Sequence, residues 1–494
     1  MSDILDEIIR LRRETYAKQG PSFGETIPKR RTRPVLPFLP EAGVILEIKR
    51  ASPSKGDIAP ELDPVTLALH YEKAGATSIS VLTEQSFFKG SLKDLVSVSS
   101  ACPDTAFLRK DFLLYEDEIE ISYRCGADAV LLIARILELP LLLKMAQLCR
   151  SFGMLPFIEV RSEADLAKLA VVAKSVTVLA GVNSRDLATF QIDPLVPARL
   201  ISRLPCRAVF ESGASTAEAC QFARRLGFYG ILIGEAAARN PEYAKTLVSS
   251  FLSSHPDWVG LFWREVAQRK KKFPLVKICG LTRVEDALLA SSLGADLLGF
   301  VFAESPRCAS TSVVRDISSQ LTVSSSSQKR PLLIGVITSV DSNFAREALS
   351  LVLEGVLDAI QYHGDDFASI VSELENAGGP NGLGRYAVIR LGSTDDLSRV
   401  EEAKKRGEPR VLVDARVDGI LGGTGTLISK NLLKDLSANS QLWLAGGINA
   451  SNVSYIITEY SPELIDASSG LESSPGKKDQ ELLKRFFKEI HACL

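Results

Sequence analysis

The sequence lacks three features that would each define a class of protein. Its eight cysteines include no C-x-x-C pair, which argues against a zinc knuckle and against a disulfide framework. The formal net charge is only −2, so no global field draws the chain to nucleic acid or to an anionic membrane. No apolar run reaches the roughly 20 residues that a transmembrane helix needs. We therefore expect a reduced, cytoplasmic protein with small-molecule partners, no nucleic acid and no membrane.

The first 18 residues also lack the continuous apolar stretch of a secretory signal. They mix both signs of charge at helical spacing, which predicts an amphipathic helix. The whole chain has 494 residues, which exceeds what one hydrophobic core usually fills. Apolar residues make up 46% and charged residues 24%, as in ordinary globular enzymes. Length and composition together predict two large domains.

Short runs rich in Val, Ile and Leu recur along both halves of the chain, each followed by a helical pattern. Eight runs lie between residues 44 and 235, and eight more lie between residues 275 and 470. Continuous apolarity predicts parallel strands that are covered on both faces. The pattern therefore predicts an α/β protein of two consecutive (β/α)8 barrels, the first with an extra N-terminal helix. Open doubly wound sheets are the alternative. Polar residues at the end of strand after strand favour barrels, because a barrel gathers the carboxyl ends of all its strands at one mouth.

The boundary between the two halves is predicted from a basic amphipathic segment that ends in a lysine run and a proline. We expect domains at residues 1–255 and 273–494, joined by a linker helix at 256–272. The charged run at residues 269–272 is interpreted as a solvated face in preference to a phosphate-binding patch.

Charged and polar residues collect where the strands of the first half are expected to end. An isolated Lys or Glu at such a place is usually half of a rim salt bridge. Several together are costly to desolvate unless they neutralise each other or a substrate, and they shift one another's pKa values, so they can serve as acids and bases. The set is Glu47, Lys49, Lys110, Glu159, Asn183, Arg185, Glu211 and Ser212.

Glycine follows the seventh and eighth runs of the first half, in ESGAST and GILIGEAAA. Backbone amides at a loop and helix start bind phosphate well, and barrels usually build such a site after strands seven and eight. Each glycine alone could equally be a turn residue. Their joint position favours a phosphate site.

The motifs EIKRASPSKG, LRKDF, FIEV, GVNSRDL, ESG and LIGEA, in this order, resemble those of the indole-3-glycerol-phosphate synthase family. The resemblance implies a carboxy-lyase that closes, decarboxylates and dehydrates 1-(2-carboxyphenylamino)-1-deoxyribulose 5-phosphate without a cofactor. It also implies that Lys110 is the general acid and that Glu159, Glu47 and Lys49 manage the later proton transfers. The implied substrate-orienting and phosphate-binding residues are Asn183, Glu211, Ser52, Arg185, Ser212, Gly213 and Gly234. Residues 34–43 are richer in proline than is usual there, which bears on closure over the site.

The second half places Cys279 directly after its first strand, beside Lys277. A lone cysteine is usually buried filler. A thiol beside a cation can, however, lose its proton more easily and act as a base. Asp414 ends the sixth run, where it could be a partner acid or merely a helix cap. Glycine and serine again fill the loops after the seventh and eighth runs, as in a phosphate site.

VKICGLT, SPR, QYHG, VDAR with GGTG, LAGGI and SSGLE with PGKKD resemble the motifs of the phosphoribosylanthranilate isomerase family. The resemblance implies that Asp414 protonates the furanose oxygen, Cys279 takes the sugar-carbon proton and Arg307 pairs with the anthranilate carboxylate. His363 is placed near the mouth, although a structural histidine is nearly as good an interpretation, and Tyr362 stands where a smaller residue is expected. The phosphate candidates are Gly423, Gly425, Gly446, Gly447, Ser468, Ser469 and Gly470.

Together the two resemblances imply a bifunctional enzyme of tryptophan biosynthesis whose second barrel makes the substrate of the first. No cofactor or metal is expected, and the oligomeric state stays open, a monomer included. One alternative is a scaffold of decayed barrels, but the charged strand ends are present. Another is a different sugar-phosphate isomerase and aldolase pair, in which Lys110 would form a Schiff base.

Overall fold

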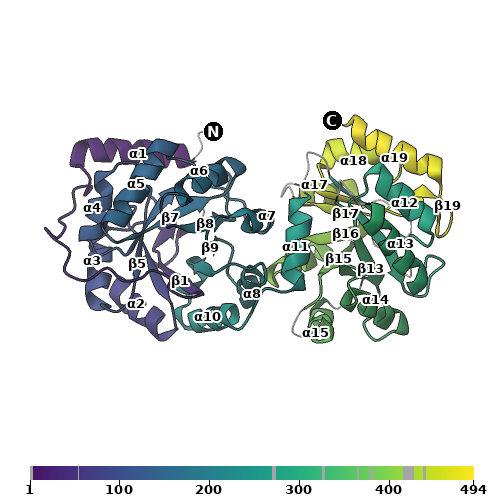
Figure 1. Ribbon diagram of the computed structural model, residues 1–494, viewed down its shortest axis with the longest axis horizontal. Coiled ribbons are helices and arrows are strands. Elements are labelled where there is room, and N and C mark those ends of the chain that lie inside the picture. The colour runs from purple at the N-terminus through teal and green to yellow at the C-terminus, as the bar shows by residue number, and fades with distance from the viewer. Residues whose placement is uncertain are drawn as a thin grey trace. The chain divides into compact units, whose positions relative to one another are not determined.

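The computed structural model describes residues 4–53, 55–269, 274–324, 329–363, 367–378, 382–415, 428–437 and 441–493. The chain forms two compact units, Met1–Pro256 and Asp257–Leu494. In each unit a central ring of strands is surrounded by helices (Figure 1). Both rings are closed parallel barrels of eight strands. The predicted fold class is thereby confirmed, and the open-sheet alternative is wrong.

The eight strands of the first barrel coincide with the eight apolar runs. Their residues are buried almost throughout, because helices cover the outside and side chains fill the inside. They are β1 (Gly43–Ile48), β4 (Ser78–Leu82), β5 (Phe107–Lys110), β6 (Ala129–Ile133), β7 (Leu155–Val160), β8 (Leu179–Asn183), β9 (Ala208–Glu211) and β10 (Gly230–Ile233). The barrel closes where β1 pairs with both β10 and β4.

In the described residues of the first unit, α-helices surround the barrel and cover its ends (Figure 1). They are α1 (Ile4–Gln19), α2 (Pro64–Lys73), α3 (Leu92–Ala101), α4 (Asp117–Arg124), α5 (Leu139–Ser151), α6 (Glu163–Ala173), α7 (Leu195–Leu200), α8 (Ala217–Arg225), α9 (Glu235–Arg239) and α10 (Ala244–Leu252). A short hairpin, β2 (Ala51–Ser52) with β3 (Gly56–Asp57), follows β1. The predicted N-terminal helix is α1, whose Leu5 and Ile8 join the core cluster of the barrel.

Residues 34–43 lie at the amino ends of the strands, opposite the mouth. The Leu36 amide donates to Asp128, which precedes β6, and the Leu39 amide donates to Ser78 at the start of β4. Phe38 and Leu39 belong to the core cluster inside the barrel. This proline-rich segment therefore covers the bottom of the barrel.

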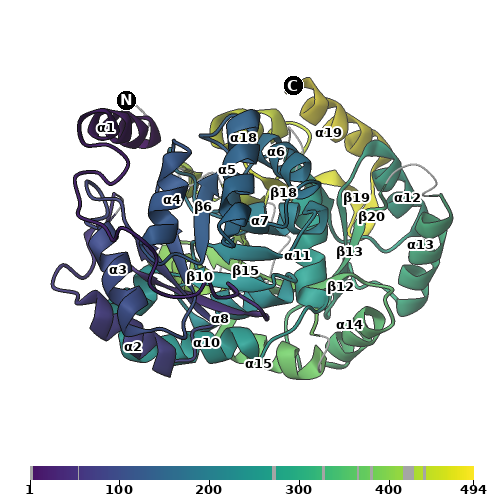
Figure 2. The same ribbon diagram turned by 60° about the vertical axis from the view of Figure 1, so that its left-hand side comes forward.

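The second barrel is formed by β11 to β18 in sequence order. Its strands are β11 (Leu275–Ile278), β12 (Leu297–Phe302), β13 (Leu332–Ile337), β14 (Ala359–His363), β15 (Arg385–Leu391), β16 (Val411–Ala415), β17 (Trp443–Ala445) and β18 (Leu464–Ala467). Its helices are α11 (Trp258–Gln268), α12 (Val284–Leu293), α13 (Thr311–Ser324), α14 (Asn343–Leu353), α15 (Phe367–Gly378), α16 (Leu397–Lys405), α17 (Lys430–Ser437), α18 (Val453–Tyr460) and α19 (Gln480–Ala492). The hairpin β19 (Glu472–Ser474) with β20 (Lys477–Lys478) follows β18, and α19 lies beside α12 and α18 (Figure 2).

The helix α11 belongs to the second unit, where it packs against residues at the start of the strands. The Phe262 ring stacks on Tyr386 with centroids 6.0 Å apart, and the Trp263 ring lies 5.7 Å from Trp443. Arg269, expected on a solvated face, is buried and donates to the Arg330 carbonyl oxygen at 2.6 Å. That expectation is wrong for Arg269, because its guanidinium satisfies a backbone acceptor below the second barrel. The other residues of the charged run lie outside the described part of the chain.

Candidate active sites

At the mouth of the first barrel, Lys110 lies among carboxylates from other strands. Its Nζ atom is 2.6 Å from Glu211 Oε2 at the end of β9 and 3.7 Å from Glu159 Oε2 on β7. Beside them, Lys49 directly follows β1, and its Nζ atom is 3.6 Å from Oε1 of Glu47 on β1. Closure of the barrel brings together residues that are far apart in the sequence, such as Glu47 and Glu211, which are 164 positions apart. Five residues of the predicted set thus form one cluster: Glu47, Lys49, Lys110, Glu159 and Glu211.

The cluster shifts the pKa values of its members in different directions. Burial acts to lower the pKa of Lys110, but the charges of Glu211 and Glu159 outweigh it, so the pKa is raised. Burial lowers the pKa of Lys49, and Glu47 compensates only in part. Burial raises the pKa of Glu211. The charge of Lys110 acts to lower it, and the neighbouring Glu159 charge acts to raise it further. The site therefore holds a firmly protonated lysine, a more acidic lysine and a carboxyl group that accepts protons readily.

Two glycines make room for the carboxylates of this cluster. A Cβ on Gly181 of β8 would lie 1.9 Å from Glu211 Oε1, and one on Gly234 would lie 2.7 Å from Glu47 Oε1. Gly234, which we expected at the phosphate, thus has a second reason to be glycine. Side chains at either position would displace a carboxylate that faces the lysines.

The remaining predicted residues lie in the loops around the mouth. Asn183 ends β8, and its Oδ1 atom accepts from the Arg185 amide at 2.9 Å. Ser212 and Gly213, with φ of +67° and +80°, form a left-handed turn after β9. A left-handed serine is uncommon, and such backbone strain gathers at functional sites. Ser52 is buried in the β2–β3 hairpin above β1.

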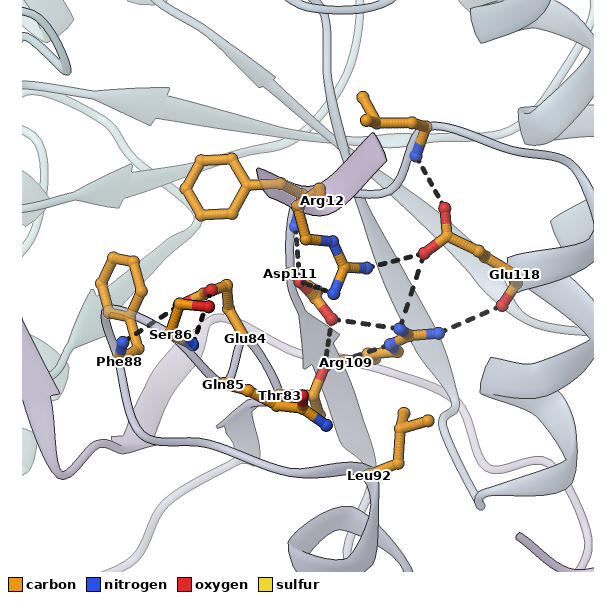
Figure 3. Close-up of polar contacts among 12 residues, drawn as sticks. Arg12, Thr83, Glu84, Gln85, Ser86, Phe88, Leu92, Arg109, Asp111 and Glu118 are labelled. Atoms are coloured by element: carbon orange, nitrogen blue, oxygen red, sulfur yellow. Dashed lines mark hydrogen bonds and ion pairs between the residues drawn. The ribbon is translucent and has the colours of Figure 1, made fainter. Parts of the chain in front are cut away.

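A loop that sequence reasoning missed follows β4 and places Phe88 beside Lys49. The Glu84 carboxylate accepts the backbone amides of residues 86, 87 and 88, at 2.8 to 3.0 Å (Figure 3). The Lys49 Nζ lies 5.2 Å from the centroid of the Phe88 ring. Glu84 follows the run SISVLT, so a polar residue after a strand was the available signal.

A buried charge cluster, also missed, joins α1 to the segment that follows Lys110. The Arg12 guanidinium contacts Asp111 Oδ1 at 3.3 Å and Glu118 Oε1 at 2.7 Å, and Arg109 contacts Asp111 Oδ2 at 3.0 Å (Figure 3). All four side chains are nearly inaccessible to solvent. Asp111 also accepts the Thr83 hydroxyl at 2.6 Å. The extra helix is therefore fastened to the ends of β4 and β5.

At the mouth of the second barrel, Cys279 directly follows β11 and is buried beside Lys277. Lys277 Nζ contacts Asp466 Oδ2 on β18 at 2.6 Å. Burial raises the pKa of the Cys279 thiol, and the charge of Lys277 opposes that rise without cancelling it. The expectation that the thiol loses its proton more easily beside this cation is therefore wrong, because desolvation dominates.

Asp414 has the electrostatic character of a proton donor. It ends the inward-facing part of β16, and burial raises its pKa to about 6. His363, at the end of β14, is buried, and desolvation together with the Lys277 charge lowers its pKa to about 3. The imidazole is therefore neutral at physiological pH. Tyr362 points the other way along β14 and belongs to the outer core cluster.

Arg307 is paired with a carboxylate of its own barrel. Its Nε and Nη2 atoms donate to the Glu472 carboxylate at 2.9 to 3.1 Å, and Lys478 donates to the same carboxylate at 3.0 Å. One edge of the guanidinium is therefore occupied. A substrate carboxylate would have to bind the remaining edge or displace Glu472.

The loops after β17 and β18, which contain the phosphate candidates, pack against each other. Gly446 and Gly447 have φ of +89° and +61°. A Cβ on Gly470 would lie 2.6 Å from the Ile448 carbonyl oxygen. Lys478 Nζ donates to the Ser468 carbonyl oxygen at 3.1 Å, and Ser469 begins the 3-10 turn that contains Gly470. Gly423 and Gly425 lie outside the described residues.

The described ranges contain neither a cluster of metal ligands nor a membrane-spanning helix. No three His, Cys, Asp or Glu side chains gather there as a metal would require. No helix in those ranges combines the length and apolarity needed to cross a bilayer.

The fold and the two mouths define a class: a protein of two (β/α)8 barrels in tandem, each with buried ionisable side chains at its mouth. Residues 18–249 match the family model described as indole-3-glycerol phosphate synthase, and residues 276–489 match that of N-(5'phosphoribosyl)anthranilate (PRA) isomerase. The indole-3-glycerol phosphate synthase of Desulfosudis oleivorans is 43% identical over 199 residues, which is 40% of this chain and 74% of that protein. That of Rippkaea orientalis is 35% identical over 252 residues, covering 49% and 82%. The chain belongs to the indole-3-glycerol phosphate synthase family and carries a PRA isomerase domain after it.

A longer relative contains both domains. The multifunctional tryptophan biosynthesis protein of Phycomyces blakesleeanus is 32% identical over 505 residues, which cover 90% of this chain and 62% of that protein. The chain thus spans about three fifths of the length of this relative. The family resemblances inferred from the motifs are confirmed.

Proposed function

We propose that this chain catalyses two consecutive steps of tryptophan biosynthesis. The second barrel isomerises N-(5-phosphoribosyl)anthranilate, and the first converts the product to indole-3-glycerol phosphate. The observation that carries the proposal is the contact of Lys110 with Glu211 and Glu159 across three strands, in a domain of this family. Both substrates are sugar phosphates, and every step uses side chains of the chain itself.

In the isomerase step, Asp414 gives its proton to the furanose oxygen as the bond between that oxygen and the anomeric carbon breaks. The nitrogen lone pair then forms an iminium ion. The Cys279 thiolate takes the proton from the adjacent sugar carbon, and the enolamine that results tautomerises to the ketone. A pKa of about 6 suits Asp414 as an acid near neutrality. Arg307 would hold the anthranilate carboxylate with its open edge, and the loops after β17 and β18 would hold the phosphate.

In the lyase step, the aromatic carbon that bears the carboxylate attacks the ribulose carbonyl carbon. Lys110 protonates the carbonyl oxygen as the new carbon–carbon bond forms, and carbon dioxide then leaves. Glu159, with Glu47 and Lys49, moves the protons that release the hydroxyl group as water. Asn183 and Glu211 would orient the substrate hydroxyls, and Ser52, Arg185, Ser212, Gly213 and Gly234 would surround the phosphate.

The carboxylates around Lys110 favour this role over Schiff-base chemistry. A lysine that attacks a carbonyl must be unprotonated, whereas Glu211 and Glu159 keep this one charged. Borohydride added with a keto-sugar phosphate should therefore trap no adduct on Lys110. A trapped adduct, located by peptide mass spectrometry, would assign the barrel to the aldolase class.

The decisive experiment supplies N-(5-phosphoribosyl)anthranilate to the purified chain and follows indole-3-glycerol phosphate by chromatography. We expect the product without any added enzyme or cofactor. Accumulation of the deoxyribulose intermediate alone would leave only the isomerase, and no conversion would refute the proposal. All eight cysteines are free thiols, which supports our proposal that the protein works in the reducing cytoplasm.

A further inference from the structure

An ion pair lies inside the second barrel, and its lysine lies on β11, two residues before Cys279. Lys277 on β11 and Asp466 on β18 are register partners on neighbouring strands, and both side chains point into the barrel. Lys277 Nζ and Asp466 Oδ2 are 2.6 Å apart, with 0% and 6% of the two side chains exposed. We call Lys277 and Asp466 the buried pair. Neither is needed to close the barrel, and two buried charges are costly where apolar residues would pack as well.

The lysine end of the buried pair faces the Cys279 sulfur. A Cβ on Gly299 of β12 would lie 2.7 Å from Cys279 Sγ and 3.0 Å from Lys277 Nζ, so both atoms border the space above this glycine. The positive charge of Lys277 acts to lower the pKa of the thiol. A glycine on the neighbouring strand thus leaves room for the ammonium group and the sulfur on the same side of the barrel.

The carboxylate end of the buried pair has unused capacity. Asp466 Oδ1 is buried and accepts no hydrogen bond from the described residues. Asp466 lies opposite Ala445 of β17, the strand that separates it from Asp414 on β16, and at Asp414 its repulsive charge outweighs the attractive charge of Lys277. For Cys279 the order is reversed, because the lysine effect exceeds that of Asp466. The buried pair therefore acts as a dipole, positive toward the thiol and negative toward the acid.

We propose that Lys277 and Asp466 are positioning residues of the isomerase reaction, which together bias Cys279 toward the thiolate and Asp414 toward the protonated acid. The inference deepens the proposed function and rests on it for the roles of Cys279 and Asp414. A base and an acid in one apolar pocket would otherwise tend to exchange roles, since the thiol is the weaker acid of the two. The dipole opposes that exchange at both groups.

Other charges also face these two groups: Lys478 acts on the thiol in the same direction as Lys277, and Arg390 opposes Asp466 at Asp414. Lys478 of β20 faces both Cys279 and Asp466. Arg390 of β15 faces Asp414 and His363. Arg307 and Glu472 border Gly280, and the Tyr386 hydroxyl faces Lys277. These groups stay unchanged in the variants below, so they shift the absolute pKa values but not the order of the variants.

Removing either member of the buried pair should move the Cys279 pKa in opposite directions. In Asp466→Asn the lysine charge acts on the thiol without compensation, so the thiol pKa should fall. In Lys277→Met the thiol loses its counter-ion, so its pKa should rise. A charge this close typically shifts a pKa by roughly one to three units. General damage to the barrel would shift the Cys279 pKa in the same direction in both variants, or would expose the thiol to solvent in both.

The experiment measures alkylation of Cys279 by iodoacetamide in the full-length chain as a function of pH, peptide by peptide. Cys493, which is exposed, provides an internal reference in each sample. Glu463→Gln is the matched control, because Glu463 forms another buried ion pair, with Arg410 at the amino end of β16. We expect the Cys279 midpoint to increase in the order Asp466→Asn, wild type and Glu463→Gln together, Lys277→Met.

A variant that removes both charges keeps the test decisive if a single variant fails to fold. Lys277→Met with Asp466→Leu leaves no unpaired buried charge, and its Cys279 midpoint should lie between those of wild type and Lys277→Met. Equal midpoints in wild type and the double variant would overturn the inference. So would a shift of the same sign in the two single variants.

A second measurement follows kcat/KM of the isomerase step across pH. When the required base has a higher pKa than the required acid, the profile rises near the lower value and falls near the higher one. Asp466→Asn should therefore move both limbs to lower pH, and unmoved limbs would contradict the inference. Thiol alkylation does not depend on turnover. Absence of isomerase activity in the wild type would thus refute the proposed function, whereas a wrong order of midpoints would refute the buried pair's role.

Discussion

The two mouths share a fold but arrange their charges differently. In the first barrel, Lys110 contacts carboxylates that the proposed function places among the reacting groups, 2.6 Å from Glu211. In the second, the ion pair of Lys277 and Asp466 is separate from the proposed base and acid, with Lys277 on β11 two residues before Cys279. In the proposed function one site keeps a charged proton donor ready, and the other biases a thiol and a carboxyl group through a neighbouring ion pair. The difference teaches that a barrel can place charge either on the reacting groups or beside them.

The largest effect that separates the two mouths is expected from Lys110→Met. The variant removes the proposed proton donor and its charge, so the lyase rate should fall by roughly 10²- to 10⁴-fold. The isomerase rate, followed in the same sample, should stay at the wild-type value. Lys144→Met, which alters an exposed lysine on α5, is the matched control. Equal loss of both activities would contradict two separate sites.

Asp414→Asn should produce the converse result. The amide cannot donate a proton to the furanose oxygen, so the isomerase rate should fall by a factor in the same range, roughly 10²- to 10⁴-fold. The lyase should still convert the deoxyribulose intermediate when it is supplied directly. Asp316→Asn on the exposed side of α13 is the control. An unchanged isomerase rate would assign the proton donor to another group.

A pair of glycine substitutions sharpens the comparison at smaller size. In Gly181→Ala the added methyl group would overlap Glu211, and in Gly299→Ala it would press on Cys279 and Lys277. A displacement of about 1 Å can cost roughly 100-fold in rate. Gly181→Ala should thus impair only the lyase and Gly299→Ala only the isomerase, with each variant serving as the control for the other. Loss of the distal activity in either variant would contradict the assignment.

A change in α1 should affect stability and leave both rates unchanged. Arg12→Met breaks the buried contacts with Asp111 and Glu118, which should lower the stability of the first unit by roughly 3–5 kcal/mol. Arg10→Met on the same helix breaks only an exposed pair, worth about 0.5 kcal/mol or less. The three tryptophans all lie in the second unit. Calorimetry should therefore show an earlier first-unit transition in Arg12→Met, while the tryptophan fluorescence transition stays in place.

The sequence predicts most of the fold because each strand has its own apolar run, which can be recognised without knowing which strands it pairs with. It also predicts residues at strand ends, such as Lys110 and Cys279, because parallel strands converge there. It does not predict Asp466, which lies within the run LIDASSG and matters only through a strand nearly 190 positions away. Arg12 was missed for the same reason, since its partner Glu118 is 106 residues distant. The direction of the Cys279 pKa shift depends on burial, which no spacing reveals.

The contact of Arg12 with Glu118 also has a consequence for synthesis on the ribosome. The helix α1 precedes its binding partners in the chain, and they follow only after β4, β5 and the start of α4 have been translated. Until then its buried arginine and the apolar Leu5 and Ile8 have nothing of their own barrel to pack on. A helix that is made before its barrel is thus among the later ones that can settle into place.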